Sequence, residues 1–232
     1  MRYAVLGTGA VGRTVAARLA SLGHEVVIGT RDPKATLART EPDGYGNPPF
    51  AEWLAYHDRI RLETFAGAAA WGEEVVNTTS GDGSLAALEA AGTANLAGKV
   101  LIDIANPLDF SQGVPPSLNP VNTDSLGEQI QRAFPEAKVV KTLNTMNCQI
   151  MVDPARVPGE HTVFVSGDDA GAKQVVTDLL VSFGWPESSV LDLGDISTAR
   201  GTEMLLPIWL RLWGALGHAD FNFHIQGART GA

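Results

Sequence analysis

The chain has 232 residues, of which 44% are hydrophobic and 19% are charged, so it can bury a substantial core as one large domain or two small ones. Its net charge of −9 argues against partners such as nucleic acids and anionic membranes. The single cysteine, Cys148, excludes internal disulfides and cysteine-based metal clusters.

The first predicted elements are a strand, a glycine-rich turn and a helix. The apolar run Met1–Leu6 leads directly into Gly7-Thr8-Gly9-Ala10-Val11-Gly12, and helical apolar spacing follows. In this context the G-x-G-x-x-G pattern is a dinucleotide-binding fingerprint. Gly7 permits the tight turn, Gly9 lets the backbone approach a pyrophosphate, and Gly12 lets the helix pack closely on the sheet. The motif predicts phosphate binding at the amino end of the helix, and a turn without a ligand is the alternative.

The second predicted strand, Glu25–Gly29, ends where a dinucleotide site reads the adenosine ribose. NAD-binding sites place Asp or Glu there to bind the 2′-hydroxyl. Here the position holds Thr30 and Arg31, with Lys34 one helical turn further on. These residues favour a 2′-phosphate, and hence NADP, because a guanidinium can hold a phosphate with paired hydrogen bonds. Asp32 would restore NAD as a candidate if its side chain pointed inward, and a solvated charged turn is the alternative.

The rest of the chain alternates strands with helices. Within an insertion at 41–58 we expect a loop over 41–49 and a small helix over 50–56. Further strands are predicted over residues 60–65, 74–77, 99–104, 137–143, 162–166 and 190–193. Further helices are predicted after Lys34 and over residues 85–91, 125–134 and 170–183. This alternation predicts an α/β fold, a doubly wound and mainly parallel sheet of the Rossmann type.

Polar loops follow the predicted strands at the edge where open α/β sheets bind ligands. Residues 78–83 form one such loop, and Asn106-Pro107 closes the strand at 99–104. The proline-containing segment 108–123 is expected to be irregular, and long loops of this kind are commonly functional. Thr123 or Asp124 is the expected cap of the helix that follows.

The chain ends on an apolar helix predicted over residues 198–216. Apolar side chains surround it almost completely, so we expect both faces to be buried in the core, at a dimer interface or under a flat ligand. We therefore expect an NADP-binding Rossmann domain at 1–195 and a helical segment at 196–232 that packs on the site or on a dimer interface. The apolar stretch 204–216 is shorter than the ~20 residues of a membrane span, so a cytoplasmic protein is expected.

Several motifs in this order resemble the coenzyme F420-dependent NADP oxidoreductases. They are Gly7–Gly12, Thr30–Asp32, Ile102–Pro107 and Lys141–Thr145, with Leu205–Leu212 similar to that family's C-terminal helix. The nucleotide module also resembles the cytoplasmic reductase part of the six-transmembrane epithelial antigen metalloreductases, which pair NADPH with a flavin. The first resemblance spans nearly the whole chain. It implies an oxidoreductase that passes a hydride between NADP(H) and coenzyme F420.

The resemblance also implies a set of cofactor-binding residues. On the side of the 2′-phosphate it places Thr8, Thr30, Arg31 and Lys34. Along the middle of the cofactor it places Thr78, Thr79 and Ser80. Around the nicotinamide it places Asn106, Pro107, Asn144 and Met146. The segment 108–123 lies where the second ligand is expected, which is F420 or else FMN or FAD.

No catalytic acid or base and no metal site is predicted. The histidines lie away from the carboxyl ends of the predicted strands: His24, His57, His161, His218 and His224. No spacing of His, Cys, Asp or Glu suggests a metal site. Cys148 is expected to be a small buried filler, and Lys141 is expected to face away from the cofactor.

The sequence leaves three functions open. The leading hypothesis is hydride transfer between NADP(H) and a flavin-like carrier, which by resemblance is F420. The protein is expected to act as a homodimer. The second is an NADPH-dependent reductase of another small substrate, such as a flavin, a ferric chelate, an imine or a hydroxy acid. The third is a non-catalytic protein that senses NADP.

Overall fold

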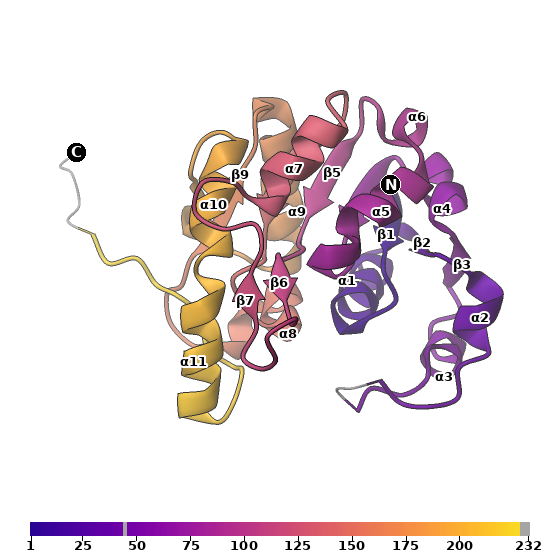
Figure 1. Ribbon diagram of the computed structural model, residues 1–232, viewed down its shortest axis with the longest axis horizontal. Coiled ribbons are helices and arrows are strands. Elements are labelled where there is room, and N and C mark those ends of the chain that lie inside the picture. The colour runs from indigo at the N-terminus through magenta and orange to yellow at the C-terminus, as the bar shows by residue number, and fades with distance from the viewer. Residues whose placement is uncertain (44–45, 228–232) are drawn as a thin grey trace.

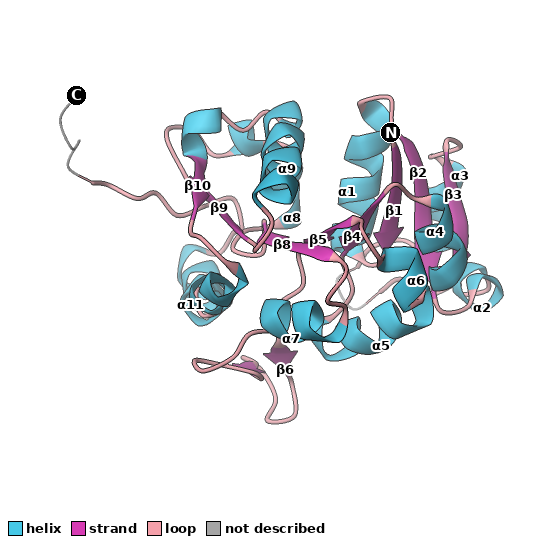
Figure 2. Ribbon diagram, turned by 90° about the horizontal axis from the view of Figure 1, so that it is seen from above, coloured by secondary structure: helices cyan, strands magenta, loops and turns pink. Residues whose placement is uncertain are grey.

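The structure is a computed structural model that describes residues 1–43 and 46–227. Residues 44 and 45 of the predicted loop, and the last five of the segment 196–232, lie outside this part of the chain. An eight-stranded sheet crosses the molecule with helices on both faces (Figures 1 and 2). Its strand order is β10-β9-β8-β5-β4-β1-β2-β3, with β9 antiparallel to β8 and the other neighbours parallel. The predicted doubly wound, mainly parallel sheet is therefore confirmed.

The strands match the predicted positions closely. The large sheet consists of β1 (Arg2–Leu6), β2 (Glu25–Thr30), β3 (Ile60–Thr64), β4 (Glu74–Asn77), β5 (Val100–Asp103), β8 (Lys138–Thr142), β9 (Val163–Ser166) and β10 (Val190–Asp192). A separate antiparallel pair is formed by β6 (Leu108–Asp109) and β7 (Ser117–Leu118). This short hairpin lies within the segment 108–123, which the sequence predicts to be irregular throughout.

The helices cover both faces of the sheet. On one face, seen at the upper side of Figure 2, lie α1 (Ala10–Ser21), α8 (Cys148–Val152) and α9 (Ala170–Phe183). On the other lie α4 (Phe65–Trp71), α5 (Gly81–Ala91), α6 (Thr93–Leu96) and α7 (Leu126–Ala133). The remaining helices are α2 (Pro33–Leu37), α3 (Phe50–Ala55), α10 (Ala199–Glu203) and α11 (Leu206–Leu216). Across the described ranges, every helix is too short or too polar to cross a membrane.

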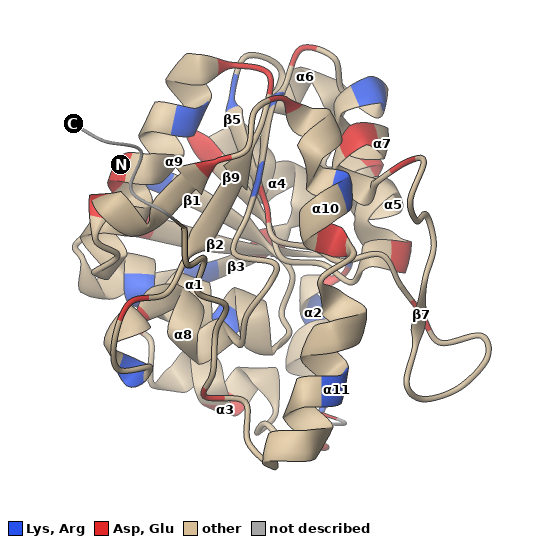
Figure 3. Ribbon diagram, turned by 90° about the vertical axis from the view of Figure 1, so that its left-hand side faces the viewer, with Lys and Arg blue, Asp and Glu red and all other residues tan. Residues whose placement is uncertain are grey.

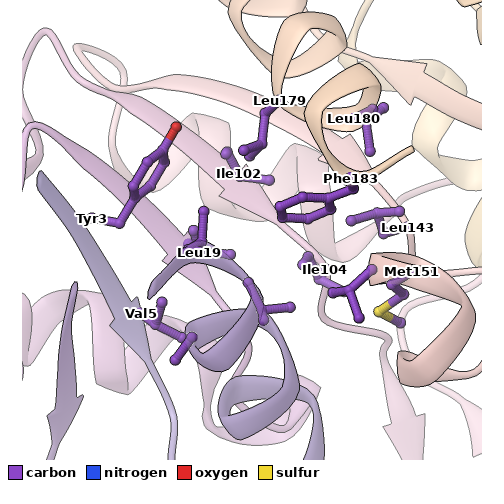
Figure 4. Close-up of a cluster of buried hydrophobic side chains, with 14 of the residues drawn as sticks. Tyr3, Val5, Leu19, Ile102, Ile104, Leu143, Met151, Leu179, Leu180 and Phe183 are labelled. Carbon is purple, nitrogen blue, oxygen red and sulfur yellow. The ribbon is translucent and has the colours of Figure 1, made fainter. Parts of the chain in front are cut away.

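The core forms two layers because successive side chains of a strand point to opposite faces of the sheet. Tyr3 and Val5 of β1 belong to the cluster that packs against α1 and α9 (Figure 4). Ala4 and Leu6 belong to the cluster on the other face. Strands buried on both faces read as continuous apolar runs, which explains why the sequence located them well.

Helix starts differ from the predictions where a hydroxyl caps the first turn. Thr64 ends β3 and its Oγ1 accepts a hydrogen bond from the Gly67 amide at 3.0 Å, so α4 begins at Phe65 instead of extending the strand. Ser125, not Thr123 or Asp124, caps α7. Its Oγ accepts from the Glu128 amide at 3.1 Å and donates to the Glu128 carboxylate at 2.7 Å, so the hydroxyl caps the helix and also orients the carboxylate of its first turn.

The predicted C-terminal helix over 198–216 is not continuous. It is interrupted at Met204-Leu205, and α11 starts anew with Pro207 in its first turn, where a missing N–H costs nothing. Of the three expected kinds of burial, burial of both faces in the core of one chain is not found, since Leu206 is the only residue of α11 buried by the described chain. Ile208, for example, remains 47% exposed.

Candidate functional site

A cleft of about 1080 Å³ opens at the carboxyl edge of the sheet, beside the point where the strand order reverses between β1 and β4. Ligands bind at such switch points in open α/β sheets because the loops on either side diverge. The lining comes from the turn after β1, the loops after β4, β5 and β8, the insertion before α3, the β6–β7 hairpin and α11. Segments far apart in the sequence therefore meet in one cavity.

The structure explains in different ways why each of the three positions in the first turn is a glycine. Gly7 has φ +126°, and a Cβ there would lie 2.8 Å from the Thr78 carbonyl oxygen. A Cβ on Gly12 would overlap the Gly7 carbonyl oxygen. A Cβ on Gly9 would meet no atom within 4 Å, although Gly9 lines the cleft. The protein's own packing thus accounts for Gly7 and Gly12, while Gly9 leaves open space for the close approach of a ligand.

The amino end of α1 faces this space. Gly9 is its N-cap, and within the described ranges no side chain caps the first turn. Ala10 and Val11, the first residues of the helix, line the cleft. Uncapped N–H groups at the positive end of a helix dipole form a site for an anion such as a phosphate.

The turn after β2 carries the residues predicted to select NADP. The Thr30 hydroxyl is buried and hydrogen-bonded to the Thr36 hydroxyl at 2.9 Å, whereas Arg31 and Lys34 are exposed. Asp32 accepts a hydrogen bond from the Ala35 amide at 3.0 Å and caps α2. The Asp32 carboxylate is thus used to cap α2. This weakens the main argument for NAD, which needs the Asp32 side chain to point inward.

A second cavity of about 510 Å³ adjoins the cleft, and Gly9 and Arg13 line both. Thr8, Thr36 and Arg39 are also part of its lining. Arg13 is buried, with hydrogen bonds to the carbonyl oxygens of Thr8 at 2.8 Å and Pro48 at 2.6 Å. Arg13 thereby ties the insertion to the glycine turn. No local pattern in the sequence indicates this role for Arg13, because Pro48 lies 35 residues away.

The loop after β4 presents hydroxyl groups that are held in place. The Thr78 hydroxyl donates to the Leu6 carbonyl oxygen at 2.8 Å, and the Thr79 hydroxyl donates to Asn77 Oδ1 at 2.7 Å. Thr78, Thr79 and Ser80 all line the cleft, as expected for residues along the middle of a cofactor.

The loops after β5 and β8 are joined by a pair of amides. Asn106 Nδ2 donates to the Asn144 carbonyl oxygen at 2.7 Å, and Asn144 Nδ2 donates to Asn106 Oδ1 at 3.0 Å. Leu143, the first residue after β8, has φ +61°, a strained conformation for a non-glycine residue. Asn106, Asn144 and Met146 line the cleft, while Pro107 is buried and lies outside its lining among the described residues.

An apolar wall of the cleft is formed by α11 and the β6–β7 hairpin. Its residues are Phe110, Leu206, Trp209, Leu210 and Trp213. The rings of Trp209 and Trp213 lie 5.9 Å apart between centroids. Flat aromatic surfaces of this kind favour contact with a planar ligand. The apolar pattern of the C-terminal helix signalled the wall, but not the residues that face the cleft.

Few ionisable groups reach the cleft. Among the described lining residues they are Arg13, Arg18, Asp82, Cys148 and Asp153, with no His, Lys, Glu or Tyr. Cys148 was expected to be a buried filler, but it is half-buried, and the Thr14 hydroxyl lies 3.7 Å from its Sγ. The lining thus offers a binding surface with little acid–base chemistry.

Comparison with known proteins identifies the family. A family model described as NADP oxidoreductase, coenzyme F420-dependent, matches residues 2–107. A crystal structure from Arthrobacter sp. FB24, assigned as an F420-dependent NADP reductase, is 67% identical with a TM-score of 0.93, over 97% of this chain and 99% of that chain. The F420-dependent NADP reductase of Methanothermobacter marburgensis is 26% identical over 219 residues, which cover 91% of this chain and 92% of that protein.

Metalloreductase STEAP3 of Rattus norvegicus is 27% identical over 212 residues, which cover 90% of this chain but 38% of that protein. The chain thus spans well under half the length of that relative. The match to the Arthrobacter structure extends over nearly the full length of both chains, and the family model covers the glycine turn and the loops after β2, β4 and β5. The chain therefore belongs to the coenzyme F420-dependent NADP oxidoreductase family and is an NADP-dependent oxidoreductase.

Proposed function

We propose that this oxidoreductase transfers a hydride between NADP(H) and a deazaflavin of the F420 type. The observation that carries the proposal is the pairing of two unlike walls in one cleft, the uncapped amino end of α1 and the aromatic face of α11. The volume of about 1080 Å³ lies at the upper limit of ordinary small-molecule sites, roughly 300–1,000 Å³. This size suits a dinucleotide with a second ring system against it.

The cleft, the adjoining cavity and the turn after β2 each have a proposed task. The N–H groups of Ala10 and Val11 bind the pyrophosphate, next to the open space at Gly9. The 2′-phosphate contacts Thr8, Thr30, Arg31 and Lys34. The central part of NADP contacts Thr78, Thr79 and Ser80. Asn106 and Asn144 hold the nicotinamide, with Pro107 and Met146 beside it. Residues 1–195 thus bind NADP, and the segment 196–232 shapes the acceptor side.

The proposed mechanism relies on alignment. Bound NADP(H) would supply or accept the hydride, and the one proton that reduction of a deazaflavin also takes up would come from water and return to it in the reverse reaction. The Asn106–Asn144 pair fixes one side of the reacting space, and Trp209 and Leu210 keep water from the other. Alignment of two reactants can lower a barrier by roughly 7–11 kcal/mol. This contribution requires no proton donor, which agrees with the small number of ionisable groups in the described lining.

The proposed assembly is a homodimer that covers the outer face of α11. Ile208 on this face is 47% exposed, and the only charged residue of this helix is Arg211, the single blue segment on α11 in Figure 3. Exposed apolar patches of this kind commonly mark protein interfaces. The cytoplasmic location expected from the sequence stays a prediction.

A panel of hydride acceptors tests the function. Purified protein with NADPH is mixed with oxidised F420, FMN, FAD, a ferric chelate or a cyclic imine, and absorbance is followed. Turnover that is strongest with F420 is the expected result. Faster turnover with a free flavin or ferric chelate would instead favour the chemistry suggested by the similarity to STEAP3. Tight NADPH binding without turnover of any acceptor would favour the sensor.

A further inference from the structure

A charged cluster is buried directly beneath the loops of the cleft. It consists of Lys141 on β8, Asp103 at the end of β5 and Glu203 at the end of α10, with relative exposures of 1%, 0% and 2%. Lys141 Nζ lies 2.8 Å from Asp103 Oδ2 and 2.7 Å from Glu203 Oε1, and it also donates to the Ala105 carbonyl oxygen. All three N–H donors of the ammonium are therefore used.

The cluster carries one surplus negative charge, which backbone amides and an amide side chain accommodate. Glu203 accepts hydrogen bonds from the amides of Leu126 at 2.9 Å and Gly127 at 3.1 Å, at the positive end of α7. Asp103 Oδ1 accepts from Asn77 Nδ2 at 2.9 Å. Burial alone would lower the pKa of Lys141, but Asp103 and Glu203 together outweigh it and raise that pKa above its ordinary value. Lys141 therefore stays charged, and its ion pairs with Asp103 and Glu203 stay formed.

Both ends of the cluster reach the walls of the cleft. At one end Asn77 Oδ1 accepts the Thr79 hydroxyl at 2.7 Å, and the Lys141 contact to Ala105 lies one residue before Asn106. At the other end Glu203 is the last residue of α10, three residues before Leu206 begins the aromatic wall. Elsewhere α11 is loosely held, with Leu206 its one buried residue.

We propose that Glu203 is a positioning residue that sets the distance between the aromatic wall and the nicotinamide side of the cleft, through Lys141 and Asp103. This inference rests on the proposed function for its kinetic consequence. Glu203 does not line the cleft among the described residues, so it acts only through the elements it joins. Its loss should misalign the two rings and leave the binding of NADPH at the glycine turn intact.

Glu203→Gln tests the proposal. The Glu203 carboxylate accepts hydrogen bonds from Lys141 Nζ and from the amides of Leu126 and Gly127, and a side-chain amide cannot accept from all three donors. The variant leaves Lys141 and Asp103 as a neutral pair. Glu128→Gln is the matched control. Glu128 pairs with Arg200 at 2.6 Å and joins the same helices, α7 and α10, without contacting the cluster. Both variants remove one negative charge from the α7–α10 contact.

Two readouts are compared with wild type. The first is energy transfer from tryptophan to bound NADPH, which needs no acceptor. Trp53, Trp209 and Trp213 all line the cleft, and of these only the two on α11 are expected to move in the variant. The second is the single-turnover rate of hydride transfer to whichever acceptor turns over fastest, at saturating ligands. For Glu203→Gln we expect lower energy transfer, a hydride-transfer rate reduced about tenfold, and an NADPH Kd within about twofold of wild type.

The control separates positioning from general loosening. Glu128→Gln should leave both readouts at their wild-type values. Unchanged readouts in Glu203→Gln, or equal losses in both variants, would overturn the proposal. If Glu203→Gln does not fold, Glu203→Asp keeps the charge but shortens the side chain by one methylene, and the same two readouts decide. Failure of F420 as acceptor would contradict the proposed function alone, because the energy-transfer result does not depend on it.

Discussion

At the scale of single residues, the site is built from backbone positions and short polar side chains. Gly9 offers space, Asn106 and Asn144 bind each other, and the threonines after β4 are anchored to neighbouring strands. Such groups orient a ligand without taking part in proton transfer. Substitutions here should therefore change binding and alignment before they change folding.

Arg31→Ala should weaken NADPH binding about tenfold or more. The guanidinium is exposed at the end of β2, and a hydrogen bond to a charged group contributes about 1.5–3 kcal/mol, which corresponds to this change in Kd. Affinity for NADH, which lacks the 2′-phosphate, should hardly change. Titration by fluorescence checks both cofactors, and equal losses would show that Arg31 supports the turn instead of reading the phosphate.

Gly9→Ala should abolish dinucleotide binding and leave the thermal stability of the ligand-free protein close to wild type. The new methyl group meets no atom within 4 Å of the protein, but it occupies the path of the pyrophosphate. Calorimetric titration and thermal unfolding measure the two effects. Gly12→Ala is the contrasting variant, since its Cβ would overlap the Gly7 carbonyl oxygen and should lower Tm. Retained NADPH binding in Gly9→Ala would contradict the assignment of the turn.

At the scale of elements, α11 stands apart from the rest of the fold. One side of it lines the cleft, and the opposite side exposes apolar groups to solvent. The tail beyond it returns to the body of the protein, where the Thr162 amide donates to the Phe223 carbonyl oxygen at 2.8 Å. The position of α11 therefore depends on its two ends and, in the proposed homodimer, on the second copy.

Ile208→Asp should convert the proposed dimer into a monomer. Ile208 lies on the outer face of α11 and is 47% exposed, so a carboxylate there costs nothing in the monomer but is desolvated at an interface. Light scattering during gel filtration gives the mass of each species. Leu37→Asp, at a 43% exposed residue on α2, is the control and should leave the mass unchanged. A monomeric wild-type protein at micromolar concentration would refute the dimer.

At the scale of the whole molecule, the sheet buries ionisable groups at both of its edges. At the carboxyl edge Lys141 is neutralised by carboxylates, whereas at the amino edge Glu74 is 5% exposed and its Oε2 has no hydrogen-bond partner among the described residues. Burial raises the pKa of Glu74, partly offset by a hydrogen bond from Tyr3. A buried carboxylate without full pairing lowers the free energy of unfolding once it ionises.

Glu74→Gln should stabilise the protein at pH 8 and have little effect at pH 4. Because the folded pKa is raised above the unfolded one, the contribution of Glu74 is fully present below the unfolded pKa and is lost as pH rises through the folded pKa. Thermal unfolding across this range measures the effect. Glu73→Gln, at an exposed residue paired with Arg2, should bring no such gain. A Tm that falls at pH 8 in Glu74→Gln would contradict the argument.

No single His→Ala, Lys141→Ala or Cys148→Ala substitution should slow the chemical step more than about a hundredfold, the low end of general acid–base contributions. The histidines lie outside the described lining, and Lys141 is sealed beneath it. Lys141→Ala leaves two buried carboxylates unpaired, so its rate is to be measured on folded protein only. Single-turnover kinetics with both ligands bound provide the test. A loss of about 10⁴-fold in any variant would reveal a general acid or base.

The sequence alone determined the succession of the main strands along the chain and the glycine-rich turn that leads into α1. Both follow from local physics: buried parallel strands are continuous apolar runs, and a G-x-G-x-x-G turn between a strand and a helix has few other uses. The family resemblance named the residues after β4, β5 and β8, and the carboxyl ends of parallel strands bring these loops to one edge of the sheet. Short helices such as α8 (Cys148–Val152) were missed, since one or two turns carry too little periodicity.

The tertiary structure alone decided how distant segments are joined. Nothing local links Lys141 to Glu203, or Arg13 to Pro48, because such pairs depend on how the chain folds back across 62 and 35 residues of sequence. The same holds for α11, whose apolar sequence predicted burial while the fold leaves its outer face exposed. An apolar composition predicts that a helix is buried. Only the folded structure shows which side of the helix is covered by other residues of the same chain.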